Sequence, residues 1–154
     1  MCMIHKLRYT YDHAKIVSDY EALQHRLVKH DANDTWWYNL HKLDVLKDGV
    51  TSDVIEGTIF AQILADISKD YEPVHAMFRG LPAGECYRMH TDTVDSIHVP
   101  ITPSPDFYYI YEDAHYTMDA DGSVYFFDAS KRHTACNAGL EMRVNFFIWV
   151  KRNT

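Results

Sequence analysis

The 154-residue chain fits a single domain, and its hydrophobic content of 47%, with 14% aromatic residues, is enough to bury a sizeable core. A formal net charge of −7 argues against nucleic acid or an anionic membrane as a partner, because phosphate binding needs a basic face. No apolar run approaches the roughly 18 residues of a membrane-spanning helix, so none is expected.

The three cysteines, Cys2, Cys86 and Cys136, are odd in number and far apart in the sequence. This pattern argues against a disulfide framework and predicts a reducing, cytoplasmic location. The absence of a CxxC pair argues against a thiolate zinc site. Cys136 is interpreted as a small buried apolar residue. The N-terminal residues lack the apolar stretch of a signal peptide.

Helical patterns dominate up to about residue 72. Residues 18–30 place apolar side chains on one helical face, and Ser18 or Asp19 could cap this helix. Residues 52–69 repeat the pattern, with Ser52 as a plausible N-cap. Isoleucines follow there at intervals of four: Ile55, Ile59, Ile63 and Ile67. These segments predict two amphipathic helices that cover one face of a sheet.

Three large aromatic residues, Trp36, Trp37 and Tyr38, lie between the expected helices. They are interpreted as core or domain-edge packing, since large aromatic side chains commonly fill cores. A platform for a ligand is the alternative.

Short strand patterns, separated by turn signals rich in proline and glycine, fill the rest of the chain. The expected strands are 75–79, 85–92, 96–101, 107–111, 114–118, 123–127 and 142–151. Many short strands of this kind are typical of a sandwich or barrel. The predicted fold is therefore α+β and mainly β, a double-stranded β-helix or cupin-like jelly roll. One domain, 1–154, would combine helical support over about 1–72 with a β core over about 73–154.

A histidine and an aspartate, His90 and Asp92, are two residues apart in an expected strand, so their side chains point to one face. His133 follows an apolar strand by a short turn and is the best candidate for a third ligand. Two neutral imidazoles and one carboxylate make up the facial triad that suits Fe(II). This triad leaves positions open for a bidentate 2-oxoacid and O₂.

Arg143 begins an otherwise apolar strand and shares one face of it with Asn145. A guanidinium in such a strand needs an anionic partner, because a buried unpaired charge is very costly. The distal carboxylate of 2-oxoglutarate would serve, and a surface ion pair with Glu141 is the alternative. Asn145 could reach the cosubstrate too, or it could be a polar core-edge residue bonded to the backbone.

The sequence from about Met77 to Val150 resembles the Fe(II)/2-oxoglutarate oxygenase superfamily. Within it, the chain is most similar to the aspartyl/asparaginyl β-hydroxylase-like group, which includes small free-proline hydroxylases. The matching motifs are LPAGECYRMHTD, IHVPITPSP, GSVYFFDASKRHTACNAG and MRVNFF. The resemblance implies iron ligation by His90, Asp92 and His133, and binding of the 2-oxoglutarate C5 carboxylate by Arg143. It also implies that His98 approaches the cosubstrate.

The chain departs from this family at Ser96, where members often carry an arginine, so Arg79 is expected to help anchor the cosubstrate. The presence of Asp92 favours the branch that acts on free amino acids over the peptide branch, and argues against halogenase chemistry. Arg79 and Arg88 could instead bind a substrate carboxylate or form surface salt bridges. The N-terminal 70 residues match no motif.

The expected function is hydroxylation of a C–H bond in an amino acid, an amino-acid residue or a small metabolite, with release of succinate and CO₂. The partner would be a small-molecule or peptide substrate, and no general acid or base is assigned beyond the metal ligands. Two alternatives stay open: a cupin-like metal enzyme that does not use 2-oxoglutarate and needs no cation at Arg143, and a non-catalytic jelly-roll binding module.

Overall fold

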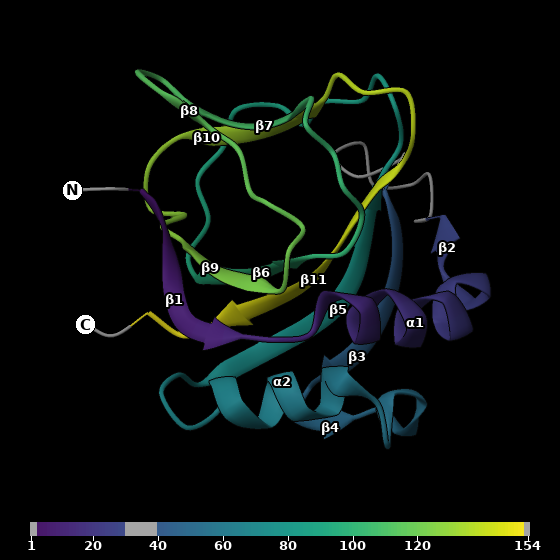
Figure 1. Ribbon diagram of the computed structural model, residues 1–154. Coiled ribbons are helices and arrows are strands. Elements are labelled where there is room, and N and C mark those ends of the chain that lie inside the picture. Colours follow the sequence, from purple (N-terminus) through teal and green to yellow (C-terminus); the bar gives the residue numbers. More distant parts are fainter. Residues whose placement is uncertain (1–2, 30–39, 153–154) are drawn as a thin grey trace.

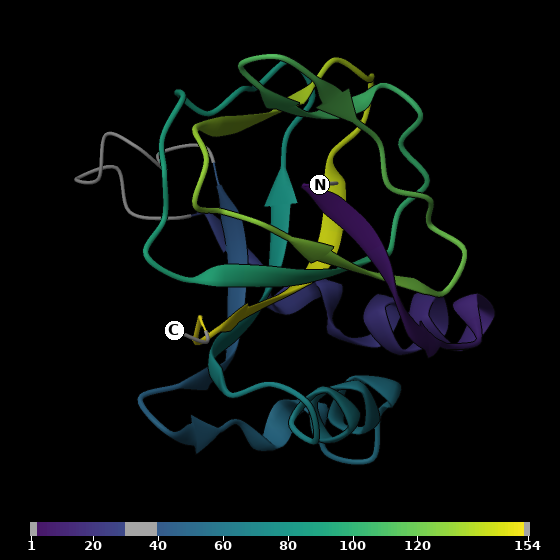
Figure 2. The ribbon, with the colours of Figure 1, turned by 90° about the vertical axis from the view of Figure 1, so that its left-hand side faces the viewer.

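The computed structural model describes residues 3–29 and 40–152. Within these two ranges, an eight-stranded and a three-stranded antiparallel sheet face each other, and two α-helices cover the outer face of the larger sheet (Figure 1). Figure 2 shows these layers from the side, with both helices on the face turned away from the smaller sheet. This arrangement confirms the predicted jelly roll with helices packed on one sheet.

The large sheet draws strands from both halves of the chain. It consists of β1 (Ile4–Thr10), β2 (Val28–Lys29), β3 (His41–Lys47), β4 (Val50–Thr51), β5 (Pro73–Leu81), β6 (Asp95–Pro100), β9 (Ser123–Phe127) and β11 (Arg143–Val150). Their order is β1-β9-β6-β11-β5-β3-β2, with β4 paired to β3. The small sheet has the order β10-β7-β8, with β7 at Phe107–Tyr111, β8 at His115–Tyr116 and β10 at His133–Asn137.

Strand β11 lies at the centre of the large sheet, between β5 and β6, and its alternation divides the molecule into two cores. The Phe146 side chain points to the helices, where its ring centroid lies 5.1 Å from that of Phe60 and 5.2 Å from that of Phe78. The side chains that alternate with Phe146 along the strand, those of Arg143, Asn145 and Phe147, face the small sheet. The alternation predicted for this strand therefore separates an apolar core from a polar interior.

The two helices are shorter than expected and begin elsewhere. Helix α1 spans His13–Leu23 and is capped by the Asp12 side chain, and η1 (Gln24–Arg26) follows it, so neither Ser18 nor Asp19 caps α1. The Asp19 carboxylate instead accepts a hydrogen bond from Ile59 N at 2.8 Å, which ties α1 to α2. The predicted cap is wrong because the helix already begins at His13, and a backbone N–H 40 residues away in sequence binds the Asp19 carboxylate.

The segment 52–69 divides into two helices. Ser52 caps the short η2 (Asp53–Ile55), and α2 spans Ile59–Ile67 with Thr58 as its N-cap. Gly57, with φ of +75°, allows the turn between them. All four isoleucines are nevertheless buried, as their spacing predicts. None of the helices in the described part of the chain is long and apolar enough to span a bilayer.

Several β elements differ from the expectation. Strands β1 and β3 lie in the part of the chain that was expected to be helical, and β10 was not predicted at all. The expected strand 85–92 is not continuous, although Tyr87 N and His90 N within it, and Gly84 N just before it, donate hydrogen bonds to β10. Trp36, Trp37 and Tyr38 lie outside the described residues.

Cys86 and Cys136 form a disulfide, which corrects the interpretation of Cys136 as a simple apolar residue. The two residues are an isolated antiparallel pair between the 82–92 segment and β10. The two cysteines are 50 residues apart in the sequence, so their proximity could not be predicted from it. The disulfide removes the observation that favoured a reducing compartment, and a cytoplasmic location stays a prediction.

Candidate active site

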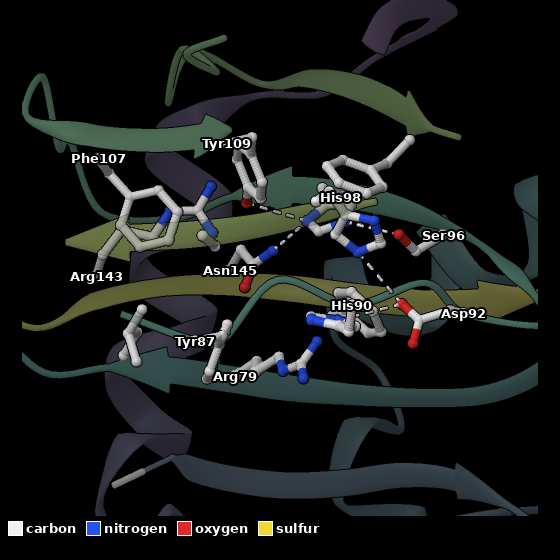
Figure 3. A pocket seen from close by; sticks show the side chains of 15 residues that line it. Arg79, Tyr87, His90, Asp92, Ser96, His98, Phe107, Tyr109, Arg143 and Asn145 are labelled. Carbon is white, nitrogen blue, oxygen red and sulfur yellow. Dashed lines mark hydrogen bonds and ion pairs between the residues drawn. The ribbon is translucent and has the colours of Figure 1, made fainter. Parts of the chain in front are cut away.

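A cavity lies between the two sheets, and its lining includes all seven side chains that the sequence assigned to metal or cosubstrate binding (Figure 3). These are His90, Asp92, His133, Arg143, His98, Asn145 and Arg79. Arg88 is exposed and is not part of the lining, although its carbonyl oxygen contacts a site histidine.

His90, Asp92 and His133 form a cluster at one end of the cavity. Their candidate ligand atoms all lie within 4.8 Å of one another. The Asp92 Oδ2 atom is 3.7 Å from His90 Nε2 and 3.4 Å from His133 Nε2. This spacing would let one metal ion contact all three atoms.

Both imidazoles are oriented by backbone carbonyls. His90 Nδ1 lies 2.7 Å from Arg88 O, and His133 Nδ1 lies 2.7 Å from Lys131 O. A carbonyl can only accept, so each Nδ1 carries the proton and donates it. Each Nε2 lone pair is then directed toward the cluster, which is the tautomer that a metal-binding histidine needs.

The backbone brings the two histidines together. His90 and His133 form an isolated antiparallel bridge, with both N–H···O distances at 2.9 Å. Residues paired in this way project their side chains to the same face of a ladder. Asp92 follows in a loop whose N–H bonds to Ala129 O at 3.0 Å. The convergence expected from a continuous strand is therefore produced by a bridge and a loop.

The protonation preferences of the cluster suit a cation. Burial lowers the pKa of His90 by more than the Arg88 carbonyl and the Asp92 carboxylate raise it. Burial raises the pKa of Asp92, but its contacts with the two imidazoles, that of His133 first, outweigh burial and lower it. Neutral His90 and ionised Asp92 are the forms that bind metals.

Arg143 occupies the opposite end of the cavity and is only 4% exposed. Its Cζ atom lies 4.3 Å from the Phe107 ring centroid and 5.4 Å from that of Tyr109. The alternative, a surface arginine paired with Glu141, does not fit this burial. An arginine held by aromatic faces keeps its planar fork of donors in a fixed orientation.

A hydrogen-bonded group centred on His98 joins the two ends. Asn145 Nδ2 donates to His98 Nδ1 at 2.7 Å, so the imidazole proton lies on Nε2 and is directed to Ser96 Oγ at 2.8 Å. The Tyr109 hydroxyl also lies 3.2 Å from His98 Nδ1. Burial lowers the pKa of His98 well below its usual value, and the nearby arginines add to this effect. His98 is therefore a neutral, fixed member of the cavity wall.

Sequence reasoning missed the aromatic wall that β7 contributes. Phe107, Tyr109 and Tyr111 are buried, whereas Tyr108 and Ile110 between them are partly exposed. Every residue of FYYIY is large and apolar or aromatic, so the sequence does not distinguish the side chains that face the cavity from those that face outward. The position of the opposing sheet makes this distinction.

An ion pair between Arg152 and Asp95 stabilises the loop that carries Asp92 from outside the cavity. Arg152 Nη2 lies 2.8 Å from Asp95 Oδ1, its Nε donates to Asp95 Oδ2 at 3.2 Å, and Nη2 also reaches Asp92 O at 3.4 Å. Asp95 Oδ1 accepts in addition from Ala129 N at 3.1 Å. This clamp ties the loop that carries Asp92 to the segment before His133.

Comparisons with known proteins agree with this architecture. The model of the aspartyl/asparaginyl beta-hydroxylase family matches residues 12–153. No curated protein matches the sequence significantly. Among solved structures, a prolyl-4-hydroxylase from Pseudomonas putida is 15% identical, with 99% of this chain and 94% of that chain covered and a TM-score of 0.68.

Two further structures share the fold. One is a Trichoplax adhaerens prolyl hydroxylase in complex with a hypoxia inducible factor peptide fragment, at 11% identity, 97% and 83% coverage and a TM-score of 0.67. The other is a viral collagen prolyl hydroxylase from Paramecium Bursaria Chlorella virus-1 in its 2OG complex, at 9% identity, 97% and 96% coverage and a TM-score of 0.64. Because the family model spans nearly the whole sequence, the chain belongs to the aspartyl/asparaginyl beta-hydroxylase family and is an enzyme of the hydroxylase class.

Proposed function

We propose that this enzyme is an Fe(II)- and 2-oxoglutarate-dependent dioxygenase that hydroxylates a C–H bond of an amino acid, an amino-acid residue or a small metabolite. One observation carries the proposal: a single cavity has a two-histidine, one-carboxylate cluster at one end and a buried arginine at the other. A metal enzyme that does not use 2-oxoglutarate has no need of the arginine, and a binding module has no need of the cluster.

The donor set fits iron. His90 and His133 offer neutral Nε2 atoms, and Asp92 offers one charged oxygen from the same side. These three ligands would hold Fe(II) while leaving positions for the cosubstrate and O₂. Bound Fe(II), together with 2-oxoglutarate, supplies the oxidising chemistry, and succinate and CO₂ are the expected co-products.

The remaining residues bind and orient. Arg143 would pair with the C5 carboxylate of 2-oxoglutarate, which offsets the cost of burying the guanidinium. Asn145, His98 and Tyr109 line the wall between the two ends, and the hydrogen bonds that His98 forms with the other two hold their side chains in place. We assign no general acid or base, because burial and the neighbouring arginines keep His98 neutral.

The test is reconstitution under anaerobic conditions with Fe(II) and 2-oxoglutarate, followed by admission of O₂. We expect one Fe(II) bound per chain and formation of succinate that depends on both Fe(II) and 2-oxoglutarate. Iron binding without 2-oxoglutarate consumption would favour a cupin-like enzyme of another type. If the protein did not bind Fe(II) at all, it could not catalyse an iron-dependent reaction, and the proposal would be refuted.

The Arg152–Asp95 clamp gives a separate prediction about the metal site. Replacing Arg152 with glutamine is expected to weaken Fe(II) binding by about 10–100-fold, the usual effect of losing a partner that orients a metal ligand. Arg152→Lys should retain part of the affinity. The measurement is an anaerobic Fe(II) titration, with Lys151→Gln as control, since Lys151 is exposed and pairs with Glu72 at 3.5 Å. Equal iron affinity in Arg152→Gln and in the control would show that the clamp does not position Asp92.

A further inference from the structure

Two of the three candidate metal ligands, His90 and Asp92, lie on the segment 82–92, which bonds to the edge strand β10 of the small sheet. Every residue of this segment is at least partly exposed. The third ligand, His133, belongs to β10 itself and is only 5% exposed. The geometry of the cluster therefore depends on how firmly a surface segment is held against a buried strand residue.

The backbone attachment of this segment to β10 is irregular. Cys86 pairs with Cys136 and His90 pairs with His133, so a step of four residues along the segment corresponds to a step of three along β10. An extra residue of this kind disrupts the hydrogen-bond ladder locally. Exposed segments with irregular hydrogen bonding open locally at a lower free-energy cost than the strands of a core. Backbone hydrogen bonds alone therefore hold the segment less firmly than they hold a regular strand.

The Cys86–Cys136 disulfide adds a covalent link between the same two parts of the chain. It joins Cα atoms 4.2 Å apart and lies on one side of the register change, whereas the bridge between His90 and His133 lies on the other. A crosslink at this place restricts the separation of the segment from β10. It therefore favours the arrangement in which the three candidate ligand atoms lie within 4.8 Å of one another.

The position of the disulfide makes it accessible to reductants. Cys86 is exposed and Cys136 is half-buried. A thiolate must reach one of the sulfur atoms to break the bond, and exposed disulfides are reduced more readily than buried ones. A disulfide that served only to stabilise the core would need no such access. Exposure and proximity to two metal ligands together distinguish this bond from a simple structural crosslink.

We propose, on the basis of the function proposed above, that the Cys86–Cys136 disulfide is a site of thiol–disulfide exchange whose redox state sets the affinity of the cluster for Fe(II). The thiolate of a small thiol bonds to the exposed Cys86 Sγ, the Cys86–Cys136 bond breaks, and its electron pair goes to Cys136 Sγ, which takes up a proton from water. A second thiolate displaces Cys86 from the mixed disulfide, and the Cys86 sulfur is protonated in turn. Two small thiols are thereby oxidised to one disulfide, and both cysteines are reduced.

Reduction changes the metal site through the segment, without a direct contact between sulfur and metal ligand. Once the covalent link is broken, only hydrogen bonds and packing hold His90 and Asp92 near His133. The ligand atoms then spend less time in the arrangement that one metal ion can contact, and iron is bound less tightly. The site therefore binds iron more tightly in oxidising than in reducing surroundings.

The test compares Fe(II) binding by the oxidised and reduced protein in a Cys2→Ser background, in which Cys86 and Cys136 are the remaining cysteines. The native, metal-free protein is treated with excess reduced glutathione, the glutathione is removed, and Fe(II) is titrated anaerobically. We expect the oxidised form to bind Fe(II) at least ~10-fold more tightly, the effect of losing a group that orients a metal ligand. Reoxidation should restore the affinity. Cys86→Ser combined with Cys136→Ser should bind Fe(II) as the reduced form does and should not respond to glutathione.

Amide hydrogen exchange of the metal-free protein shows whether the effect is local. Reduction should speed exchange over residues 84–90 by at least ~10-fold, because these amides depend on the attachment to β10. Exchange in β5 and β11, which pair with each other in the large sheet, should stay within about twofold.

Three results would each overturn the inference. Equal Fe(II) affinity in the two redox states would show that the disulfide does not act on the cluster. Resistance to glutathione until the protein is denatured would make the bond a structural crosslink, and faster exchange throughout the large sheet would show a general loss of stability. Absence of Fe(II) binding in both redox states would instead refute the proposed function, and the exchange measurement would still test the attachment of the segment.

Discussion

Replacing His133 with alanine is expected to weaken Fe(II) binding by more than about 100-fold, since even the loss of an outer partner of a metal ligand costs 10–100-fold. Succinate formation that depends on 2-oxoglutarate should fall to background at any attainable iron concentration. The reason is geometric: His133 Nε2 is one of the two imidazole nitrogens in the cluster, and Lys131 O fixes its tautomer. The measurements are an anaerobic Fe(II) titration and a succinate assay.

Two controls keep this result interpretable. His115→Ala removes an exposed histidine of β8 and should bind iron as the wild type does. His133→Gln retains a polar side chain of similar length, so comparable thermal unfolding of this variant and the wild type would separate ligand loss from misfolding. Full iron-dependent turnover in both His133 variants would show that the metal is not held by this cluster.

The parts of the fold that the sequence predicted well are those whose signal is local. The strands expected at 107–111 and 123–127 coincide with β7 and β9, and that expected at 142–151 differs from β11 by one residue at each end. Each carries a run of aromatic or β-branched residues bounded by turn signals, which suffices to identify a strand without knowledge of its partners.

The elements that were missed depend on distant partners. Strand β10 has the sequence HTACN, which lacks apolar alternation, and it forms because β7 pairs with it on one side and residues 84–90 bond to it on the other. The Cys86–Cys136 disulfide joins the same neighbouring segments. Short polar stretches of this kind become strands through tertiary contacts that override their intrinsic propensity.

The candidate site shows the same division. Residue types and spacing, together with the family resemblance for His98 and Arg79, selected seven side chains that one cavity brings together. They could not indicate how far apart Arg79 and Arg143 lie, because this depends on the register of β5 against β11, which pairs Arg143 with Leu81 and Asn145 with Arg79. Nor could they reveal the clamp between Arg152 and Asp95, whose members are 57 residues apart.

Replacing Arg143 with glutamine is expected to raise the KM for 2-oxoglutarate by on the order of 100-fold or more, because a buried carboxylate would lose its charged, bidentate partner. The sharper readout is a preference between two cosubstrates. Wild type should use 2-oxoglutarate far better than 2-oxopentanoate, which has the same chelating end but no distal carboxylate.

In Arg143→Gln this preference should collapse to within a few-fold, whatever the variant's stability, because both cosubstrates meet the same folded molecules. Arg143→Lys should be intermediate, since an ammonium supplies the charge without the planar fork. Preservation of the wild-type preference in Arg143→Gln would place the C5 carboxylate elsewhere, and Arg79 would then be the remaining arginine of the cavity able to receive it. The same experiment therefore decides which arginine of the cavity receives the C5 carboxylate.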